Sequence, residues 1–515
     1  MAAPDTGRFK WVADVARWFV DARRLTAPLA VPARVVVQRE RPAAEGDPLV
    51  AAVQSRVAEV LRGLLGDLGL RGRPQVDVAV ERPGPAGPLR FSVNGRPCRP
   101  SAGQLGPILG ELAPDAAGDP VRVPDGSLPD VVAAACAAVL RRRPSLLATD
   151  HQLDLVLFTA GRPPGSLDPR LAAALRRLLD NGIGVGDTAT LLEVVREADP
   201  AQSAAELAEA LIDRLRPPTL DVLLPEATLR RATTAQPVPA TSFSEVRGRL
   251  LQRLGVQPPD LRLVVDDSLP PGTCALRINH LTTWPRPVPQ AAPLDALYAR
   301  IEEAATNNAY RFLAVSTVRQ SLDQLGLAFP DRVGQVTDRY PMAWLSAVLR
   351  CLVEEAVPID DLITSMLLDW LLDLDDQGGG RDVVRLPEGP ADPARAAPLP
   401  APRDVVAYVR QRAWEDAWSI APGDATLPVH RLADALVPDD AAGPDGWPQA
   451  AAVERLTDAV RALRPERSPG IPLVVSSLPG RARVREALAA EFPELTVVAS
   501  QELPPWVRLV PVPQG

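Results

Sequence analysis

Residues 175–190 read LRRLLDNGIGVGDTAT, and residues 349–364, 174 positions further along the chain, read LRCLVEEAVPIDDLIT. The apolar, acidic and turn positions of the two stretches stay in step. The matched pairs are Leu175 and Leu349, Arg176 and Arg350, Leu178 and Leu352, Asp180 and Glu354, Ile183 and Val357, Val185 and Ile359, and Asp187 and Asp361. A repeat at one fixed offset is typical of a duplicated folding unit. The sequence therefore predicts two tandem modules.

The chain's 515 residues exceed what one hydrophobic core usually holds, and this length indicates about three to five domains. Hydrophobic residues make up 46% of the chain but aromatic residues only 4%, so the cores must consist mainly of Leu, Val and Ala. We therefore predict a helix-rich, multi-domain α+β and α/β protein. In each module a small α+β unit is followed by a helical subdomain.

The order of apolar runs and turn signals predicts the same plan in both modules. The elements expected in module one (residues 32–235) are a strand at 35–39, a helix at 49–65, strands at 75–80 and 89–93, helices between 128 and 215, and a closing strand at 220–224. Module two follows a linker at 236–242. It comprises an α+β subdomain at 243–290 and a helical subdomain at 291–375, with helical runs expected at 294–325, 331–354 and 359–372.

The two ends of the chain have no counterpart in the repeat. Residues 1–31 hold an amphipathic segment at 7–24, which either packs on its own first domain or lies on a membrane surface or a partner. A linker rich in Gly, Ala and Pro at 376–403 leads into a C-terminal subdomain, residues 404–515. The elements expected there are helices at 405–418, around Arg431 and at 451–463, and a thioredoxin-like β-α-β ending with parallel strands at 472–476 and 496–500 around a helix at 481–491.

Charge and hydropathy exclude several classes of function. The 56 basic and 64 acidic residues give a net charge of −8 without a basic stripe, which argues against nucleic-acid binding. The longest apolar run, at 131–140, is well short of the roughly 18–20 residues that span a bilayer, and the N-terminus lacks a signal-peptide pattern. Cys98, Cys136, Cys274 and Cys351 are scattered singly, as expected of free thiols in a reducing compartment. We expect a cytoplasmic protein without a transmembrane segment.

No group of residues has the pattern of a catalytic, cofactor or metal site. The Gly182, Gly184 and Gly186 cluster lacks the Lys-Ser/Thr of a phosphate loop, and its repeat copy carries Pro and Asp, so it reads as an interhelical turn. Asp187 and Asp361 stand where helix N-caps belong. The three histidines (His151, His280 and His430) lie far apart in the sequence. The chain is therefore predicted not to be an enzyme.

Module two and the C-terminal subdomain resemble the FHIPEP family, in the cytoplasmic part of the flagellar and type III secretion export gate. Residues 261–279 (LRLVVDDSLPPGTCALRIN) are similar to the family's early strands, and residues 344–367 to its leucine-rich helix and "LL-x-E-x-V-x-I-R-D-L" motif, with Asp360 in place of the usual Arg. The ending at 472–512 resembles the family's last segment. The matching positions are Glu355, Val357, Ile359, Asp361, Leu362, Arg481, Pro493, Leu495, Val497, Ser500 and Glu502.

The resemblance implies a function in protein secretion through protein contacts. Implied partners are other components of the secretion apparatus and chaperone or substrate proteins, with homo-oligomeric ring assembly through the helical subdomain. The candidate assembly surface comprises Leu352, Ile359, Leu362 and Ile363. Two departures favour an alternative, a soluble cytoplasmic scaffold outside secretion. Module one stands where the family has its transmembrane block, and only about ten residues, 284–294, replace the family's inserted subdomain. Peripheral membrane contact stays open.

Overall fold

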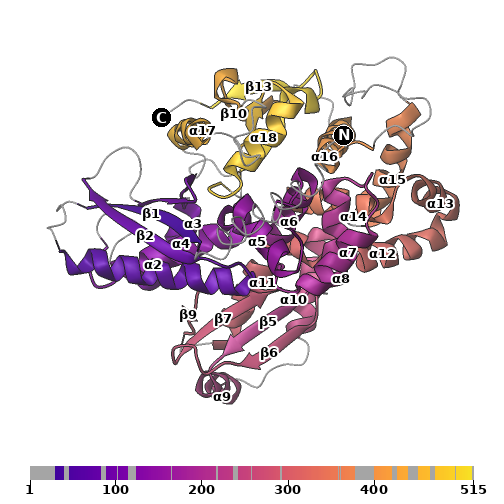
Figure 1. The fold of residues 1–515 in the computed structure, drawn as a ribbon. Coiled ribbons are helices and arrows are strands. Elements are labelled where there is room, and N and C mark those ends of the chain that lie inside the picture. Colours follow the sequence, from indigo (N-terminus) through magenta and orange to yellow (C-terminus); the bar gives the residue numbers. More distant parts are fainter. Residues whose placement is uncertain are drawn as a thin grey trace, which may run out of the picture. The chain divides into compact units, whose positions relative to one another are not determined.

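The structure of the chain, a computed structural model, is drawn in Figure 1. It describes residues 29–39, 46–82, 89–100, 102–113, 123–163, 165–215, 218–235, 242–256, 258–289, 293–355, 357, 359, 361–376, 399–419, 426–438, 450–463, 470–492 and 495–512. The chain divides into unit 1, residues 1–99 and 108–215, and unit 2, residues 100–107 and 216–515, with α3 (Ala102–Leu112) crossing the division. The predicted amphipathic segment at 7–24 lies outside the described residues, as does most of the predicted linker at 376–403.

Unit 1 opens with a four-stranded sheet. Its elements are β1 (Ala30–Gln38), α2 (Pro48–Asp67), β2 (Arg73–Glu81), β3 (Leu89–Val93) and β4 (Arg96–Cys98). The strand order is β2-β1-β3-β4, with β1 parallel to β2 and antiparallel to β3. In β1 alternate residues are buried up to Val35 and all residues are buried beyond it, and α2 packs on the neighbouring β2. Asn94 and Gly95, both with positive φ, form the predicted tight turn between β3 and β4.

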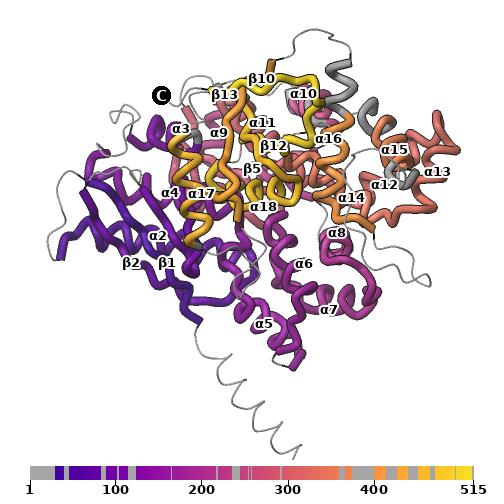
Figure 2. The backbone as a smooth tube through the Cα atoms, turned by 90° about the horizontal axis from the view of Figure 1, so that it is seen from above, coloured from indigo at the N-terminus to yellow at the C-terminus, as the bar shows by residue number. Residues whose placement is uncertain are grey.

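Helices make up the rest of unit 1. They are α4 (Leu128–Arg142), the 3-10 helix η3 (Pro144–Leu147), α5 (Asp150–Thr159), α6 (Pro169–Asp180), α7 (Thr188–Glu197) and α8 (Ala204–Leu215). In Figure 2, α6, α7 and α8 lie next to one another, and α8 packs on both of the others. The side chain of Asp187 accepts a hydrogen bond from Thr190 N at 3.1 Å, so its predicted role as the N-cap of α7 is confirmed.

The α6–α7 turn, which contains the three glycines, packs against the end of α2. Val185 N donates to Leu68 O at 2.8 Å. A Cβ on Gly69, whose φ is +67°, would lie 2.5 Å from Gly186 N, and a Cβ on Gly184 would lie 2.9 Å from Asp67 O. The segment is an interhelical turn, as predicted. Glycine is needed at Gly69 and Gly184, because the backbones of the turn and of the α2 end touch there.

Unit 2 opens with a sheet of the same topology. Its elements are β5 (Leu220–Leu224), α9 (Glu226–Ala235), α10 (Ser242–Leu254), β6 (Leu261–Val265), β7 (Thr273–Ile278), β8 (Leu281–Thr282) and β9 (Arg286–Pro287). The order is β6-β5-β7-β8, with β5 parallel to β6 and antiparallel to β7. The strand predicted to close module one is therefore wrongly assigned, because β5 pairs only with strands that follow it. A short apolar run does not reveal which strand it pairs with.

The helical part of unit 2 follows the sheet. Its elements are α11 (Pro293–Asn307), the 3-10 helix η4 (Ala309–Phe312), α12 (Val315–Ala328), α13 (Pro330–Arg339), α14 (Met342–Glu354) and α15 (Asp361–Asp376). The helical run predicted at 331–354 is in fact two helices. Tyr340, directly before Pro341, is extended with φ −111° and ψ 124°, as the residue before a proline prefers.

The two stretches of the repeat have the same local structure. The Arg176 Nε donates to Ala148 O at 3.5 Å, and Arg350 Nη2 donates to Leu313 O at 2.6 Å. Both acceptors directly follow a 3-10 helix, η3 in unit 1 and η4 in unit 2. The turns also match, since Ile183 N donates to Leu178 O as Val357 N does to Leu352 O.

A third sheet completes unit 2. Its elements are α16 (Pro402–Ser419), β10 (Thr426–Arg431), the 3-10 helix η5 (Asp434–Leu436), α17 (Ala450–Ala462), β11 (Leu473–Val475), α18 (Leu478–Leu488), β12 (Val497–Ala499), the 3-10 helix η7 (Ser500–Glu502) and β13 (Arg508–Pro511). All described strand pairs in the order β12-β11-β10-β13 are parallel, which confirms the predicted β-α-β ending. The helix predicted around Arg431 is wrong, because this segment is strand β10, held by β11 and β13.

Candidate functional site: a buried charge network

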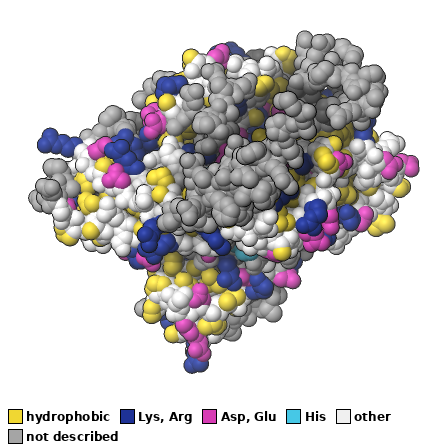
Figure 3. Space-filling view, in the orientation of Figure 1, with side chains coloured by type: hydrophobic (Ala, Val, Ile, Leu, Met, Phe, Trp, Pro, Cys, Tyr) yellow, Lys and Arg dark blue, Asp and Glu magenta, His cyan; other side chains and the backbone are white. Residues whose placement is uncertain are grey.

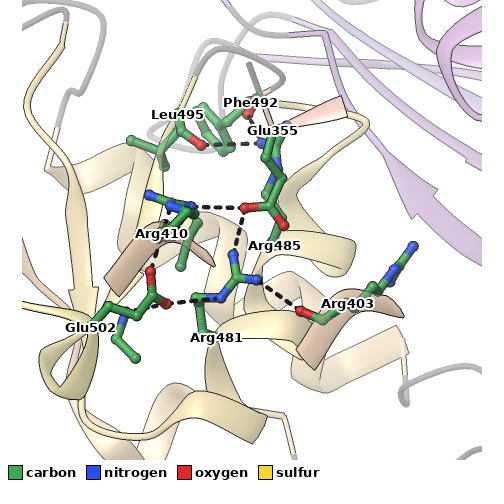
Figure 4. A network of polar contacts seen from close by, with 10 residues as sticks. Glu355, Arg403, Arg410, Arg481, Arg485, Phe492, Leu495 and Glu502 are labelled. Carbon is green, nitrogen blue, oxygen red and sulfur yellow. Dashed lines mark hydrogen bonds and ion pairs between the residues drawn. The ribbon is translucent and has the colours of Figure 1, made fainter. Parts of the chain in front are cut away.

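A network of buried charged side chains joins the helical part of unit 2 to its C-terminal sheet (Figure 4). Glu355 directly follows α14, where its backbone N–H donates to Cys351 O and Leu352 O at 3.2 and 3.1 Å. Arg410 comes from α16, Arg481 from the first turn of α18, and Glu502 ends η7. Four segments that are distant in sequence therefore each place one charged group at the same point.

Glu355 and Glu502 are each shared by the same two arginines. Glu355 Oε2 accepts from Arg410 Nη1 at 2.8 Å and from Arg481 Nη1 at 2.5 Å. Glu502 Oε1 lies 3.0 Å from Arg481 Nε, and its Oε2 lies 3.5 Å from Arg410 Nε. Backbone groups add to this cluster, since Arg410 also donates to Val497 O and Glu502 accepts from Ala499 N. The cluster holds two positive and two negative groups.

The charged groups of the network are almost completely buried. The side chains of Arg481 and Glu502 are 1% and 0% exposed, and those of Arg410 and Glu355 are 6% and 10% exposed. Burial alone would raise the pKa of Glu355, but the guanidinium groups of Arg481 and Arg410 outweigh it, and this pKa is lowered. For Glu502 burial prevails over the same two arginines, and its pKa is raised. Glu355 therefore ionises at a lower pH than Glu502.

Further polar contacts extend the junction. Arg403, at the start of α16, forms an ion pair with Glu486 of α18 at 2.9 Å, and the negative charge of Glu486 raises the pKa of this arginine. Its carbonyl oxygen accepts from Arg481 Nη2 at 3.4 Å. Arg485 donates to the carbonyl oxygens of Phe492 and Leu495 beyond α18 (Figure 4). The orientation of α18 on α14 and α16 is therefore fixed at several points.

The described residues of unit 1 hold no counterpart of this network. The repeat position that corresponds to Glu355 is Asn181, which is also buried and follows α6 in the same way. Asn181 donates from Nδ2 to Arg177 O, a carbonyl of its own helix. A neutral amide can satisfy itself locally, whereas a buried carboxylate needs positive partners. Of these two matched positions, the one in unit 2, which carries the C-terminal sheet, holds the charge.

The structure brings together three residues that the family motifs singled out, namely Glu355, Arg481 and Glu502. The structure does not bring the residues of the candidate assembly surface together in the same way. Leu352 is fully buried in the core of unit 2, and Ile359 is 8% exposed. The side chains of Leu362 and Ile363 lie outside the described residues. The assembly surface stays a prediction.

Sequence reasoning missed Arg410. It follows the apolar run Val405–Val409, whose residues are all buried, and it continues that run as a sixth buried position. A single arginine inside a buried helical run is a usable signal, because a buried charge requires a partner. The sequence does not show that this partner lies 55 residues earlier, at Glu355.

The network joins structural elements. Other kinds of site would involve cysteines, metal-ligating side chains or long apolar helices. The four cysteines are buried free thiols, and burial raises the pKa of Cys136 to about 12, so that it stays a thiol at neutral pH. In the part of the chain that the structure describes, no three His, Cys, Asp or Glu side chains gather in a way that could hold a metal ion. None of the described helices is long and apolar enough to cross a membrane.

His430 in β10 predicts that the stability of the C-terminal sheet depends on pH. It is 4% exposed, and burial lowers its pKa from the usual 6.5. The unfolded chain therefore binds a proton more readily, so this contribution to stability is complete above pH 6.5 and is lost as the pH falls through the lowered pKa. We expect His430→Gln to remove up to about 1.4 kcal/mol per pH unit of this dependence in urea titrations between pH 5 and 8. The exposed His151→Gln is the control, and equal slopes for both variants would contradict the prediction.

Comparisons with known proteins bear on the fold. No protein-family model and no curated protein sequence matches this chain. The solved structures that match include Chlamydia pneumoniae CdsV (17% identity, TM-score 0.42) and Shigella flexneri MxiA (16%, TM-score 0.41), each covering 57% of this chain and 96% and 98% of their own. Another is the nonameric EscV cytosolic domain from the type III secretion system (11%, TM-score 0.39), covering 58% and 96%.

The EscV structure is described as a cytosolic domain from the type III secretion system, and the resemblance of this chain to the FHIPEP family stays a prediction. At these identities and TM-scores the likeness concerns the fold alone.

Proposed function

We propose that this chain is a non-enzymatic component related to the export gate of type III and flagellar secretion, and that it acts in protein secretion through protein contacts. The observation that carries the proposal is the meeting of Glu355, Arg481 and Glu502 in one buried cluster. These residues match family motifs at positions up to 147 residues apart. The cluster supplies the physical reason for those residue types, because a buried carboxylate and a buried guanidinium each require the other.

Assembly through the helical subdomain is part of this proposal. We expect the purified chain to form oligomers, and we expect Leu362→Asp or Ile363→Asp to dissociate them, because a charge is costly inside an apolar contact. Multi-angle light scattering over a range of concentrations measures this. Trp506→Asp, at a 57% exposed position of the C-terminal subdomain, is the control. A chain that stays monomeric at high concentration would count against ring assembly.

The tandem modules are also proposed to descend from one duplicated unit. The shared strand order and directions of the first two sheets, the matched arginine bonds of Arg176 and Arg350, and the matched turns support this. The preceding helices add Gly69 and Gly255, with φ of +67° and +66° at corresponding ends of α2 and α10. The two sheets and the two α6–α7 and α14–α15 turns are thus the elements that the duplication would have copied.

A second candidate function is a cytoplasmic scaffold that kept the fold outside secretion. Unit 1 favours this function, because it directly precedes the part of the chain that resembles the family, where the family has a membrane block. Fractionating cells and identifying co-purified proteins separates the two functions. Export components recovered at the inner face of the membrane support the first, and soluble regulatory partners recovered from the cytoplasm support the second.

A further inference from the structure

Two arginines of the first sheet of unit 2 share one buried carboxylate. Asp221 lies on β5, between β6 and β7, and its side chain is 0% exposed. Arg262 of β6 and Arg277 of β7 are its direct neighbours in the two strand pairs. Arg262 Nε donates to Asp221 Oδ1 at 2.7 Å, and Arg277 Nη2 donates to Asp221 Oδ2 at 2.8 Å. We call these three residues the arginine row.

The arginine row carries an excess of positive charge. Burial alone would raise the pKa of Asp221, but the hydrogen bonds from Arg262 and Arg277 outweigh it, and this pKa is lowered. The carboxylate is therefore ionised at neutral pH, and it balances only one of the two guanidinium groups. The side chains of Arg262 and Arg277 are 56% and 36% exposed, so the remaining charge faces solvent.

Both arginines keep hydrogen-bond donors that Asp221 does not use. The contacts with Asp221 involve Nε and Nη2 of each guanidinium group. Among the described residues, neither arginine has a second carboxylate within ion-pair distance. A guanidinium group has further N–H donors in the same plane, on Nη1. Since both groups meet at Asp221, these donors lie around one point of the sheet.

The matching row of unit 1 shows no such excess. Asn94 and Asn279 both have a positive φ and directly follow β3 and β7, so the two sheets can be aligned on them. On this alignment Asp221 corresponds to Arg34, Arg262 to Asp77 and Arg277 to Ser92, and these three residues of unit 1 are also direct neighbours. Arg34 and Asp77 form one exposed pair at 3.8 Å, which is neutral. The positive charge of the arginine row is therefore not a requirement of this sheet topology.

Nearby carboxylates do not cancel this charge. Asp260, just before β6, already pairs with Arg247 at 2.7 Å. Asp266 and Asp267 follow the other end of β6, about 13 Å or more along the strand from Arg262, which exceeds the screening length of about 8 Å at physiological ionic strength. In Figure 3 basic and acidic side chains are both visible on the part of the surface where Figure 1 places β5, β6 and β7. The excess is thus local to the arginine row.

We propose that the arginine row binds a carboxylate of a partner protein, presented by an exposed Asp or Glu side chain. A guanidinium group pairs with a carboxylate through two parallel hydrogen bonds, and a single carboxylate matches the single excess charge. A charge that is complementary across an interface selects the partner and fixes its register. The site goes beyond the function proposed above and depends neither on secretion nor on ring assembly.

The test uses the full chain and a defined acidic peptide. The probe is the rhodamine-labelled peptide Gly-Ser-Glu-Gly-Glu-Gly-Ser, measured by fluorescence anisotropy at low ionic strength. We expect it to bind the wild-type chain and to bind Arg262→Gln about fivefold more weakly, as the loss of an exposed ion pair predicts. Arg249→Gln is the matched control, because it removes the same charge from a 51% exposed arginine that pairs with Glu302. This control should leave the affinity unchanged.

Several outcomes overturn the proposal. They are no binding to the wild-type chain, equal weakening by both variants, and equal binding of the peptide with Gln in place of Glu. Displacement of the peptide by inorganic phosphate at a lower concentration than by acetate would assign the site to a phosphate group instead. If Arg262→Gln does not fold, modification of wild-type arginines by phenylglyoxal decides. Protection of Arg262 and Arg277 by the peptide, without protection of Arg249, supports the site, and equal modification with and without the peptide overturns it.

Discussion

Glu355→Gln is expected to destabilise unit 2 by about 3–5 kcal/mol, because it leaves Arg410 and Arg481 buried with only one carboxylate between them. The loss should appear first at the junction of α14, α16 and α18. Hydrogen exchange measures this locally, and the amides of α18 should lose protection at a lower urea concentration than those of β5. Urea unfolding followed by tryptophan fluorescence gives the total cost.

Asp369→Asn is the matched control for this experiment. Asp369 pairs with Arg332 at 2.9 Å in the same unit, but both side chains are nearly half exposed. An exposed pair contributes about 1 kcal/mol or less. If the two variants cost the same, the buried network does not hold the C-terminal sheet in place. Replacing Glu355 by Leu together with Arg481 by Met should recover part of the stability lost in Glu355→Gln, since a neutral pair needs no counter-charge.

Gly69→Ala is expected to destabilise unit 1 by about 2–5 kcal/mol, from a left-handed backbone at about 1–2 kcal/mol and overpacking at about 1–3 kcal/mol. The new Cβ would lie 2.5 Å from Gly186 N, and backbone atoms cannot rotate away. Thermal unfolding and hydrogen exchange of α2 and α6 measure the effect.

Three further glycines separate the two causes. Gly95→Ala has a φ of +73° and open space, so it reports the cost of the left-handed backbone alone. Gly184→Ala meets Asp67 O at 2.9 Å and reports the cost of the clash, whereas Gly186→Ala has only an ordinary contact at 3.7 Å and should be nearly neutral. A Gly184→Ala variant as stable as Gly186→Ala would show that the turn can move away from α2.

The elements that the sequence predicted well are those whose signals are local. The turn at Asn94 and Gly95, the N-cap at Asp187 and the helices of the repeat depend on neighbouring residues. Strand pairing does not, and for this reason β5 was placed in the wrong module. At β10 the alternation of Leu427 and Val429 is too short to distinguish a strand from a helix without the neighbouring β11 and β13.

For the charge network, too, the sequence predicts individual residues but not their contacts. Glu355, Arg481 and Glu502 were singled out through motifs, but nothing in the motifs indicates that they touch. Their meeting requires the C-terminal sheet to fold back over α14, a tertiary event that no local pattern encodes. The partners of Arg410 and Arg403 were missed for this reason, because Glu355 and Glu486 lie far along the chain from α16.

Asn181 bears on how the charge network arose, if the two units descend from one. If the ancestral unit carried a carboxylate after its central helix, a copy without the C-terminal sheet would have kept an acid facing no arginine, and mutation to a neutral amide would have relieved it at once. If the ancestor carried the amide, then Glu355 and Arg481 had to arise together, since either alone is costly when buried. On either route the residue at this position changes together with the C-terminal subdomain, because a buried carboxylate is stable only where that subdomain supplies its arginines.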